Sequence, residues 1–413
     1  MISFDRYVLE NGLRLIVHED KSSPMVAVNV VYDVGSRDED PSKTGFAHLF
    51  EHLMFGGSQN VPDFDGPIQN AGGENNAFTN TDMTNFYNVL PAENVETALW
   101  LESDRMKQLV FSKKALDIQK KVVIEEFKET CLTEPYGDVW HHLSELVYEK
   151  HSYRWPTIGK TTKHIEEAKL EDVVYFFNKH YTPNNAILVI SGNMSSNRAY
   201  ELVNKWFSEI PAGHKYERNL AYDDPQTKIK QKTIMGNVPL EALYMSFHMV
   251  DRSHPDYYAY DLLSDVLSNG RSSRLFQRLY KENPMFSQID AYISGTFDPG
   301  MFVIEGRPMP KIGIEEAKQA IWNELVLLKD EQIDSRELQK LKNKIESSLE
   351  YSEVNILHKS MSLAYFELLG DANLINKEAE EYQNVTSADI QRVARKIFVP
   401  ENSTELIYMP NEN

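Results

Sequence analysis

The stretch DVVYFFNKHYTPNNAILVI at residues 172–190 has a counterpart in DIQRVARKIFVPENSTELI at residues 389–407, at a constant separation of 217 positions. Each copy predicts an amphipathic helix that ends before a Pro-Asn turn and leads into an apolar strand. Four residue types recur at matching places: Asp172, Lys179, Pro183 and Asn185 in the first copy, and Asp389, Lys396, Pro400 and Asn402 in the second. A chance likeness of two such units is the alternative, so a duplication needs a second match.

A second pair of segments occurs at nearly the same separation. VAVNVVYDV at residues 26–34 pairs with ALYMSFHMV at 242–250, and both are rich in β-branched or aromatic residues, which favours strands. Two matches make a duplicated domain the better interpretation. Because each half mixes strands with long amphipathic helices, we predict an α+β fold of two duplicated domains, each a mostly antiparallel sheet packed with helices.

The segment between the two halves, residues 211–230, is polar and turn-rich and has no helical periodicity, which is typical of a linker. We therefore expect an N-terminal domain at residues 1–215, a linker at 216–230 and a C-terminal domain at 231–413. The length of 413 residues agrees with two or three domains, each large enough to bury its own core.

The composition is acidic, with 62 acidic and 43 basic side chains and a formal net charge of -19. Such acidity opposes binding to nucleic acid or to an anionic bilayer, because both are polyanions. No stretch approaches the roughly 18–20 apolar residues of a membrane span, and the acidic N-terminal stretch is unlike a signal peptide. We expect a soluble cytoplasmic protein, or a periplasmic one if a leader has been removed, that binds neither nucleic acid nor membrane.

The chemistry of a metal site is concentrated in GFAHLFEHLMFGGSQN at residues 45–60. On a helix, His48 and His52 are four positions apart, so both imidazoles project from one face and can share a tetrahedral cation. Glu51 lies beside them, placed to take a proton from an activated water. The alternative is a pair of satisfied core histidines and a surface Glu. Because Cys131 is the only cysteine, any metal must bind through His and carboxylates.

A third ligand is expected from a second helix, in FSKKALDIQKKVVIEEFKETC at residues 111–131. Glu126 and Gln119 share a face with an apolar stripe that we expect to point inward, and Glu126 is the predicted ligand. Glu125 instead suits a solvated position paired with lysine. The alternative for Glu126 is an ion pair with a buried Lys or Arg. The predicted stripe consists of Ala115, Val122, Val123, Phe127 and Cys131.

His48, Glu51 and His52, followed 74 residues later by Glu126, resemble the inverted-zincin signature of the pitrilysin family, the M16 metallopeptidases. Residues 70–90, NAGGENNAFTNTDMTNFYNVL, resemble the segment that follows this motif in the family, including its N-A-x-T element. The resemblance covers essentially the whole chain, with the duplication and the SSRLFQRL segment at residues 272–279. The length is similar to that of the short-chain branch, which includes bacterial peptidases and the mitochondrial processing peptidase.

The resemblance implies a zinc-dependent endopeptidase that hydrolyses extended oligopeptides or unfolded segments. His48, His52 and Glu126 would hold Zn²⁺, and Glu51 would act as the general base. Asn76 and Ala77 would lie on an edge strand that binds the peptide backbone. The chain would form half of a clam-like chamber, as a homodimer or as a heterodimer with a second M16-like subunit. One zinc ion per chain is expected, because the counterpart of the metal helix, around residues 265–269, has no His.

Two positions, Gln119 and Phe286, depart from the pattern of the family. Gln119 stands where many relatives have a Glu that supports the zinc site. Arg274 matches the family's arginine that binds the scissile carbonyl, but the tyrosine expected to act with it is Phe286. Either Tyr292 or an Arg/Tyr pair on a partner subunit would take that role.

Two other functions stay open. One is a non-catalytic or structural subunit of a larger assembly, and the other is a peptide-binding chamber with a structural zinc. His141, His142 and His151 stand in an aromatic-rich stretch, so we expect them to pack and not to form a second metal site.

Overall fold

The computed structural model describes residues 1–411, which form two compact units. Unit 1 consists of Met1–Lys128, Trp155–Leu220 and Glu350–Lys377, and unit 2 consists of Glu129–Arg154, Ala221–Leu349 and the described residues from Glu378 onward. Each unit therefore contains one segment from the other half of the sequence. The continuous division at residues 1–215, 216–230 and 231–413 concerns the repeated halves and stays a prediction.

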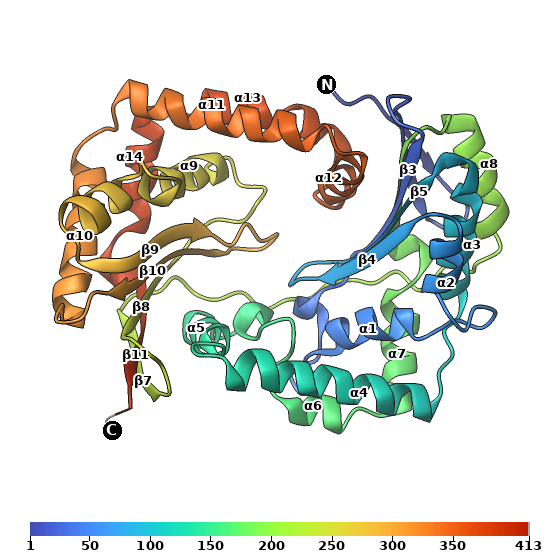
Figure 1. The fold of residues 1–413 in the computed structure, drawn as a ribbon, viewed down its shortest axis with the longest axis horizontal. Helices are drawn as coiled ribbons and strands as arrows, with labels where there is room; N and C mark the ends of the chain where they lie inside the picture. Colours follow the sequence, from blue (N-terminus) through green and yellow to red (C-terminus); the bar gives the residue numbers. More distant parts are fainter. Residues whose placement is uncertain (412–413) are drawn as a thin grey trace. The chain divides into compact units, whose positions relative to one another are not determined.

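Unit 1 contains a six-stranded sheet in the order β1-β2-β6-β3-β5-β4 (Figure 1). All neighbouring strands are antiparallel except β2 and β6, and β4 is an edge strand that pairs only with β5. The strands are β1 (Asp5–Val8), β2 (Arg14–Glu19), β3 (Met25–Tyr32), β4 (Glu74–Thr79), β5 (Thr84–Pro91) and β6 (Ala186–Gly192).

Helices cover both faces of this sheet, and the alternation along β6 shows why. Leu188 and Ile190 belong to the main apolar cluster, whereas Ile187 and Val189 belong to a second cluster on the opposite face, against which α12 packs. A strand buried on both faces reads as a continuous apolar run, as this one does. The helices of unit 1 are α1 (Phe46–Phe55), α2 (Asp65–Asn70), α3 (Val95–Lys107), α4 (Lys113–Phe127), α6 (Thr162–Glu166), α7 (Leu170–His180), α8 (Ser196–Phe207) and α12 (Ile356–Leu368).

Unit 2 contains a five-stranded sheet in the order β7-β11-β8-β10-β9, in which only β7 and β11 are parallel. Its strands are β7 (Lys230–Gly236), β8 (Ala242–His248), β9 (Phe286–Ile293), β10 (Met301–Pro308) and β11 (Ser403–Pro410). Its helices are α5 (Val139–Val147), α9 (Tyr257–Ser268), α10 (Ile314–Asp330), most of α11 (Ser335–Ser352), α13 (Glu378–Asn384) and α14 (Ser387–Ile397).

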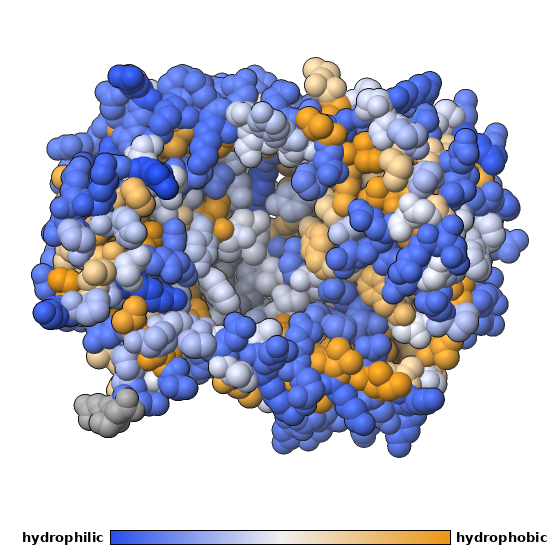
Figure 2. Space-filling view, in the orientation of Figure 1, coloured by the Kyte–Doolittle hydropathy of each residue, from blue (hydrophilic) through white to orange (hydrophobic). Residues whose placement is uncertain are grey.

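The predicted α+β class is confirmed, since each unit is a mostly antiparallel sheet packed with helices. Hydrophilic side chains predominate on the face shown in Figure 2, with apolar ones scattered among them, as expected for a strongly charged chain. A search of the helices in residues 1–411 finds none with the length and apolar character needed to span a membrane.

The repeated helix, turn and strand occur in both units with the predicted separation. Helix α7 and strand β6 begin at Leu170 and Ala186, and α14 and β11 begin at Ser387 and Ser403. The amides of Asn185 and Asn402 hold the two turns in the same way, because each donates to the last carbonyl of the preceding helix and to the carbonyl at the end of the neighbouring strand.

The second predicted match is right in its elements but wrong in its register. Tyr32 in β3 lies opposite Ala186, and Phe247 in β8 lies opposite Ser403. Tyr32 therefore corresponds to Phe247, a separation of 215, whereas the predicted pairing of residues 26–34 with 242–250 has a separation of 216. Tyr32 and Ala186 are 154 positions apart and Phe247 and Ser403 are 156 positions apart, so a single offset cannot describe both matches.

Candidate metal centre

Helix α1 is apolar around most of its circumference. Its sequence, FAHLFEHLMF, has six side chains that are buried in the core of unit 1, so the helix sits beneath the surface. His48 and His52 occupy the remaining face, with 13% and 25% of their side chains exposed. The six buried residues are Phe46, Ala47, Leu49, Phe50, Leu53 and Met54.

A buried carboxylate holds the N-terminus of α1. Glu39 accepts hydrogen bonds from the backbone N–H groups of Gly45 (2.9 Å) and Ala47 (2.8 Å), and from the indole N–H of Trp155 (3.1 Å). Burial raises the pKa of Glu39 to about 8. The sequence reasoning missed this residue, and the only signal for it is an acidic residue shortly before a helix start, where a negative group is favoured.

The three predicted ligands converge. His48 Nε2 and His52 Nε2 are 3.3 Å apart, and they lie 3.6 and 3.4 Å from the two carboxylate oxygens of Glu126 on α4. A tetrahedral site with bonds of about 2.0–2.1 Å has ligand atoms about 3.3 Å apart, so this spacing fits Zn²⁺. Within residues 1–411, these three residues form the one His, Cys, Asp or Glu group that is spaced to hold a metal ion.

The protonation states of this group also suit a metal. Burial lowers the pKa of His48, which keeps its imidazole neutral. A hydrogen bond from His52 lowers the pKa of Glu126, which keeps the carboxylate charged. Neutral imidazoles and an ionised carboxylate are the forms that bind zinc.

Glu51 lies on α1, three positions after His48 and next to His52. Its Oε2 accepts a hydrogen bond of 2.7 Å from the hydroxyl of Thr79 on β4. This bond fixes one carboxylate oxygen and leaves the other available. The sequence placed Glu51 in the site, but it gave no indication that Thr79 holds it.

The structure corrects the predicted apolar stripe of α4. Val122 is 45% exposed, so it does not belong to the buried face. The buried positions are Leu116, Val123 and Phe127, which are spaced by seven and four residues and therefore share one side of the helix. Val122 lies about 100° around the helix from Val123, on the solvent side. Glu125 is exposed and pairs with Lys128, as predicted.

Gln119 lies on α4 beside the C-terminal end of α1. A Cβ added at Gly56 would come within 3.8 Å of its Nε2. Among residues 1–411, no hydrogen bond joins Gln119 to a ligand residue, so a supporting role for its amide stays a prediction.

The predicted peptide-binding residues lie on an edge strand, as expected. Asn76 is exposed on β4 and its side-chain oxygen accepts the N–H of Ala77 at 2.8 Å, while Ala77 packs against the core. The free edge of β4 offers backbone groups to an extended segment. The substrate contacts of both residues stay predictions.

Arg274, Phe286 and Tyr292 belong to unit 2, and each has its own partners there. Arg274 makes two bonds to Glu337, at 3.0 and 3.3 Å. Phe286 is 1% exposed in the core, and the hydroxyl of Tyr292 donates to Glu305 at 3.2 Å. The role of Arg274 toward a substrate stays a prediction.

The counterpart of α1 in unit 2 is α9. Helix α1 follows β3, and α9 follows β8, which is the counterpart of β3. Helix α9 carries Asp261 and Asp265 four positions apart, but Tyr382 donates to Asp261 and Asn269 donates to Asp265 at 2.7 Å. Both carboxylates are thus used within the protein. His151 packs against the rings of Tyr148 and Tyr153, as predicted, whereas His142 lies 3.1 Å from Asp138 and 3.0 Å from Lys232.

Comparison with known proteins gives a consistent family. Residues 14–160 match the model of the insulinase family, peptidase family M16, and residues 167–345 match that of the peptidase M16 inactive domain. The zinc protease PqqE of Helicobacter pylori is 27% identical over 417 residues, which cover 97% of this chain and 92% of that protein. The uncharacterized zinc protease YmxG of Bacillus subtilis is 26% identical over 406 residues, which cover 97% of both chains.

The fold agrees with these sequence matches. The crystal structure of a protease from Helicobacter pylori superposes with a TM-score of 0.95 at 26% identity, over 99% of this chain and 100% of that chain. The chain belongs to the M16 peptidase family.

Proposed function

We propose that this chain is a zinc-dependent endopeptidase that cleaves extended oligopeptides or unfolded segments. The observation that carries the proposal is the convergence of His48, His52 and Glu126 at tetrahedral spacing beside Glu51. When bound, one zinc ion per chain would supply a Lewis acid that polarises the scissile carbonyl and makes water a better nucleophile.

Glu51 is the proposed general base. Because Thr79 occupies Oε2, the other oxygen, Oε1, accepts the proton from the attacking water. The same oxygen then donates this proton to the nitrogen of the leaving amine. The hydrogen bond from Thr79 restrains rotation of the carboxylate.

The edge strand β4 is the proposed binding platform for the substrate. An extended peptide would add to its free edge through backbone hydrogen bonds, with Asn76 and Ala77 at the point of contact. Backbone recognition is weakly selective for sequence, which fits a peptidase of extended segments and not of one folded target.

We infer that the chain is the zinc-bearing subunit of a heterodimer whose partner carries an Arg/Tyr pair. Phe286 has no hydroxyl and is buried, and Tyr292 already donates to Glu305, so unit 2 presents no tyrosine at the family's position. Purified alone, the chain should bind zinc and cleave peptides poorly, and an M16-like companion should raise turnover. Full activity of the chain as a homo-oligomer would exclude this arrangement.

A Glu51→Gln variant tests the enzyme proposal directly. Zinc content, measured by plasma mass spectrometry, should stay at one ion per chain, while hydrolysis of a quenched fluorescent peptide should fall by about 10²–10⁴-fold. Glu125→Gln, on the exposed side of α4, is the matched control and should leave both values unchanged. Unchanged hydrolysis in the Glu51 variant would favour a non-catalytic subunit or a peptide-binding chamber.

A further inference from the structure

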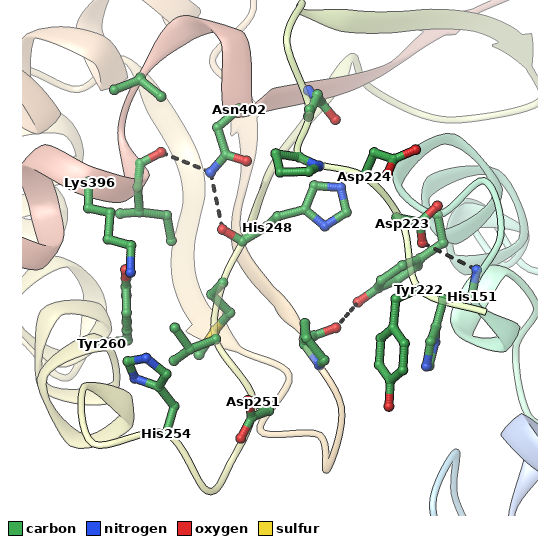
Figure 3. A pocket seen from close by; sticks show the side chains of 18 residues that line it. His151, Tyr222, Asp223, Asp224, His248, Asp251, His254, Tyr260, Lys396 and Asn402 are labelled. Carbon is green, nitrogen blue, oxygen red and sulfur yellow. Dashed lines mark hydrogen bonds between the residues drawn. The ribbon is translucent and has the colours of Figure 1, made fainter. Parts of the chain in front are cut away.

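Unit 2 contains a cavity of about 550 Å³ at the end of β8. Figure 3 shows Lys396, Tyr260 and His254 along one wall, and His151, Tyr222, Asp223 and Asp224 along the other, with His248 and Asp251 between them. A volume of this size is in the range of ligand pockets. None of the residues proposed for the metal chemistry lines this cavity.

The duplication identifies the same place in unit 1. Asn185 and Asn402 make matching hydrogen bonds, which align Asp33 with His248 at the ends of β3 and β8. The same alignment matches Lys179 and His180, at the end of α7, with Lys396 and Ile397, at the end of α14.

In unit 1 this place is filled by the chain itself. Arg218 donates to the carbonyl and carboxylate of Asp33, at 3.1 and 2.8 Å, and its Nε donates to Asp38 at 2.7 Å. The ring of Tyr216 packs against His180 at 4.6 Å and lies 4.8 Å from Nζ of Lys179. Tyr216 and Arg218 are two positions apart on a segment without helix or strand, so both side chains can enter from one side.

In unit 2 the corresponding place holds no such segment within the described residues, and no arginine lines the cavity. Acceptors remain in it: Oδ2 of Asp251 and Oδ1 of Asn402 accept no hydrogen bond from residues 1–411. Of the three carboxylates that line the cavity, Asp224 pairs with Lys150 at 2.6 Å and Asp223 accepts three backbone N–H groups, so Asp251 is the one that keeps an open oxygen. Burial lowers the pKa of His248, which adds no positive charge.

We propose that this cavity binds an extended polypeptide segment that carries an aromatic residue two positions before an arginine. The guanidinium would lie beside Asp251 and the carbonyl of His248, as Arg218 lies beside Asp33. The aromatic ring would lie against Lys396 and Ile397, as Tyr216 lies against Lys179 and His180. A guanidinium on a carboxylate is among the stronger hydrogen-bonded pairs, and the ammonium-ring contact adds to it.

The segment of this chain that fills unit 1 supplies the probe. A fluorescent peptide with the sequence of residues 214–219, HKYERN, is titrated with the full-length Glu51→Gln protein, so that the probe is not hydrolysed. Fluorescence anisotropy should show saturable binding. Replacing the peptide arginine with citrulline keeps its shape, removes its charge and should weaken binding at least about tenfold. Replacing its tyrosine with alanine should weaken binding about threefold.

Asp251→Asn assigns the binding to this cavity. Asn keeps the acceptor for the N–H of Ser253, so the local fold should persist, while the charge is lost. Binding should weaken about tenfold, and Lys396→Ala should weaken it about threefold through the aromatic residue alone. The control Asp330→Asn, an exposed change of the same charge in α10, should leave binding unchanged.

The possible outcomes separate clearly. Sensitivity to citrulline together with sensitivity to Asp251→Asn or Lys396→Ala supports the proposal. Absence of binding overturns it, as does binding that citrulline leaves unchanged. Binding that depends on the arginine but on neither cavity residue would place the peptide elsewhere, including the edge of β4, and would also overturn it.

Discussion

The two units of this chain share a plan of sheet and helix, yet α1 and α9 serve different purposes. Helix α1 follows β3 and α9 follows the corresponding strand β8, and both helices carry two potential ligands four positions apart. In α1, His48 and His52 face Glu126 from another helix. In α9, Asp261 and Asp265 are bound by Tyr382 and Asn269. The difference shows that spacing on one helix is insufficient, because a metal site also needs a third group from elsewhere.

At the ends of β3 and β8 it is unit 1 that is closed by its own side chains and unit 2 that is open to a ligand. In unit 1, Tyr216 and Arg218 close the place, whereas in unit 2 it is a cavity. Both turns contain an asparagine, Asn185 or Asn402, whose amide donates to two backbone carbonyls. A side chain without such a donor would leave these two carbonyls unpaired. A duplicated framework thus keeps its backbone bonds and varies the polar side chains around them.

The largest effect expected from this comparison is on metal content. His52→Ala removes one of three ligands, so the zinc measured by plasma mass spectrometry should fall from about one ion per chain to near zero. Peptide hydrolysis should fall with it by more than about 100-fold.

Asp265→Asn on α9 is the matched control for that experiment. Because Asp265 has no partner ligand, zinc and hydrolysis should stay at their wild-type values. Zinc that persists in His52→Ala, or that is lost in Asp265→Asn, would show that the metal binds elsewhere.

The three candidate zinc ligands and the candidate general base could be predicted from the sequence. His48, Glu51 and His52 share helix α1, and Glu126 lies on α4, a helix with a periodic apolar pattern. Thr79 and Trp155 could not be predicted. Thr79 contacts Glu51 across 28 positions and Trp155 contacts Glu39 across 116, so these bonds depend on how strands and helices pack. Periodicity describes one element at a time and contains no information on such pairs.

The linker shows the same limit. Its polar, turn-rich composition correctly indicated the absence of helix and strand, but not that Tyr216 and Arg218 are anchored on unit 1. Likewise, the register of β8 could not be predicted from a single offset, because the chain between the two matches is two residues longer in the second copy. The α+β class was predictable because both halves mix strands with long amphipathic helices.

A second, smaller effect concerns how much Arg218, bound at the end of β3, contributes to the stability of the fold. The carboxylate of Asp38 is fully buried, and Arg218 is its main cationic partner. Arg218→Ala should therefore destabilise the chain by about 3 kcal/mol, since it removes the closest cation from a buried carboxylate that the Gly35 N–H (3.0 Å) and the Tyr216 hydroxyl (3.1 Å) compensate only in part. Thermal melting followed by circular dichroism should show a decrease of several degrees.

Arg336→Ala is the control, because Arg336 is exposed on α11 and its loss should change the melting temperature little. Arg218→Lys keeps the charge but loses the paired bonds, so an intermediate value is expected. If Arg218→Ala melts like the wild type, the segment around Arg218 does not contribute to folding, and the analogy with the cavity of unit 2 loses its basis.

The last expected effect concerns how the stability of the fold depends on pH through the carboxylates at the N-termini of α1 and α9. Glu39, at α1, has a pKa of about 8 through burial, whereas hydrogen bonds from Arg392 lower the pKa of Asp256 at α9. A raised pKa in the folded state means that the folded chain holds the proton more tightly than the unfolded chain. The stability that Glu39 contributes is therefore complete below about pH 4.5 and is lost as the pH rises toward 8. Asp256 acts in reverse, and its contribution is lost as the pH falls below the normal range of Asp.

Melting temperatures of wild type, Glu39→Gln and Asp256→Asn between pH 4 and 9 test this assignment. Gln cannot ionise, so the difference between wild type and Glu39→Gln should shift steadily against the wild type from pH 5 to 8 and then level off. The Asp256→Asn difference should change only at the acid end. Three N–H donors surround Glu39 and favour its charged form, and they oppose the effect of burial. A difference that is constant above pH 6 would mean that these donors prevail and that α1 begins on a permanent negative charge.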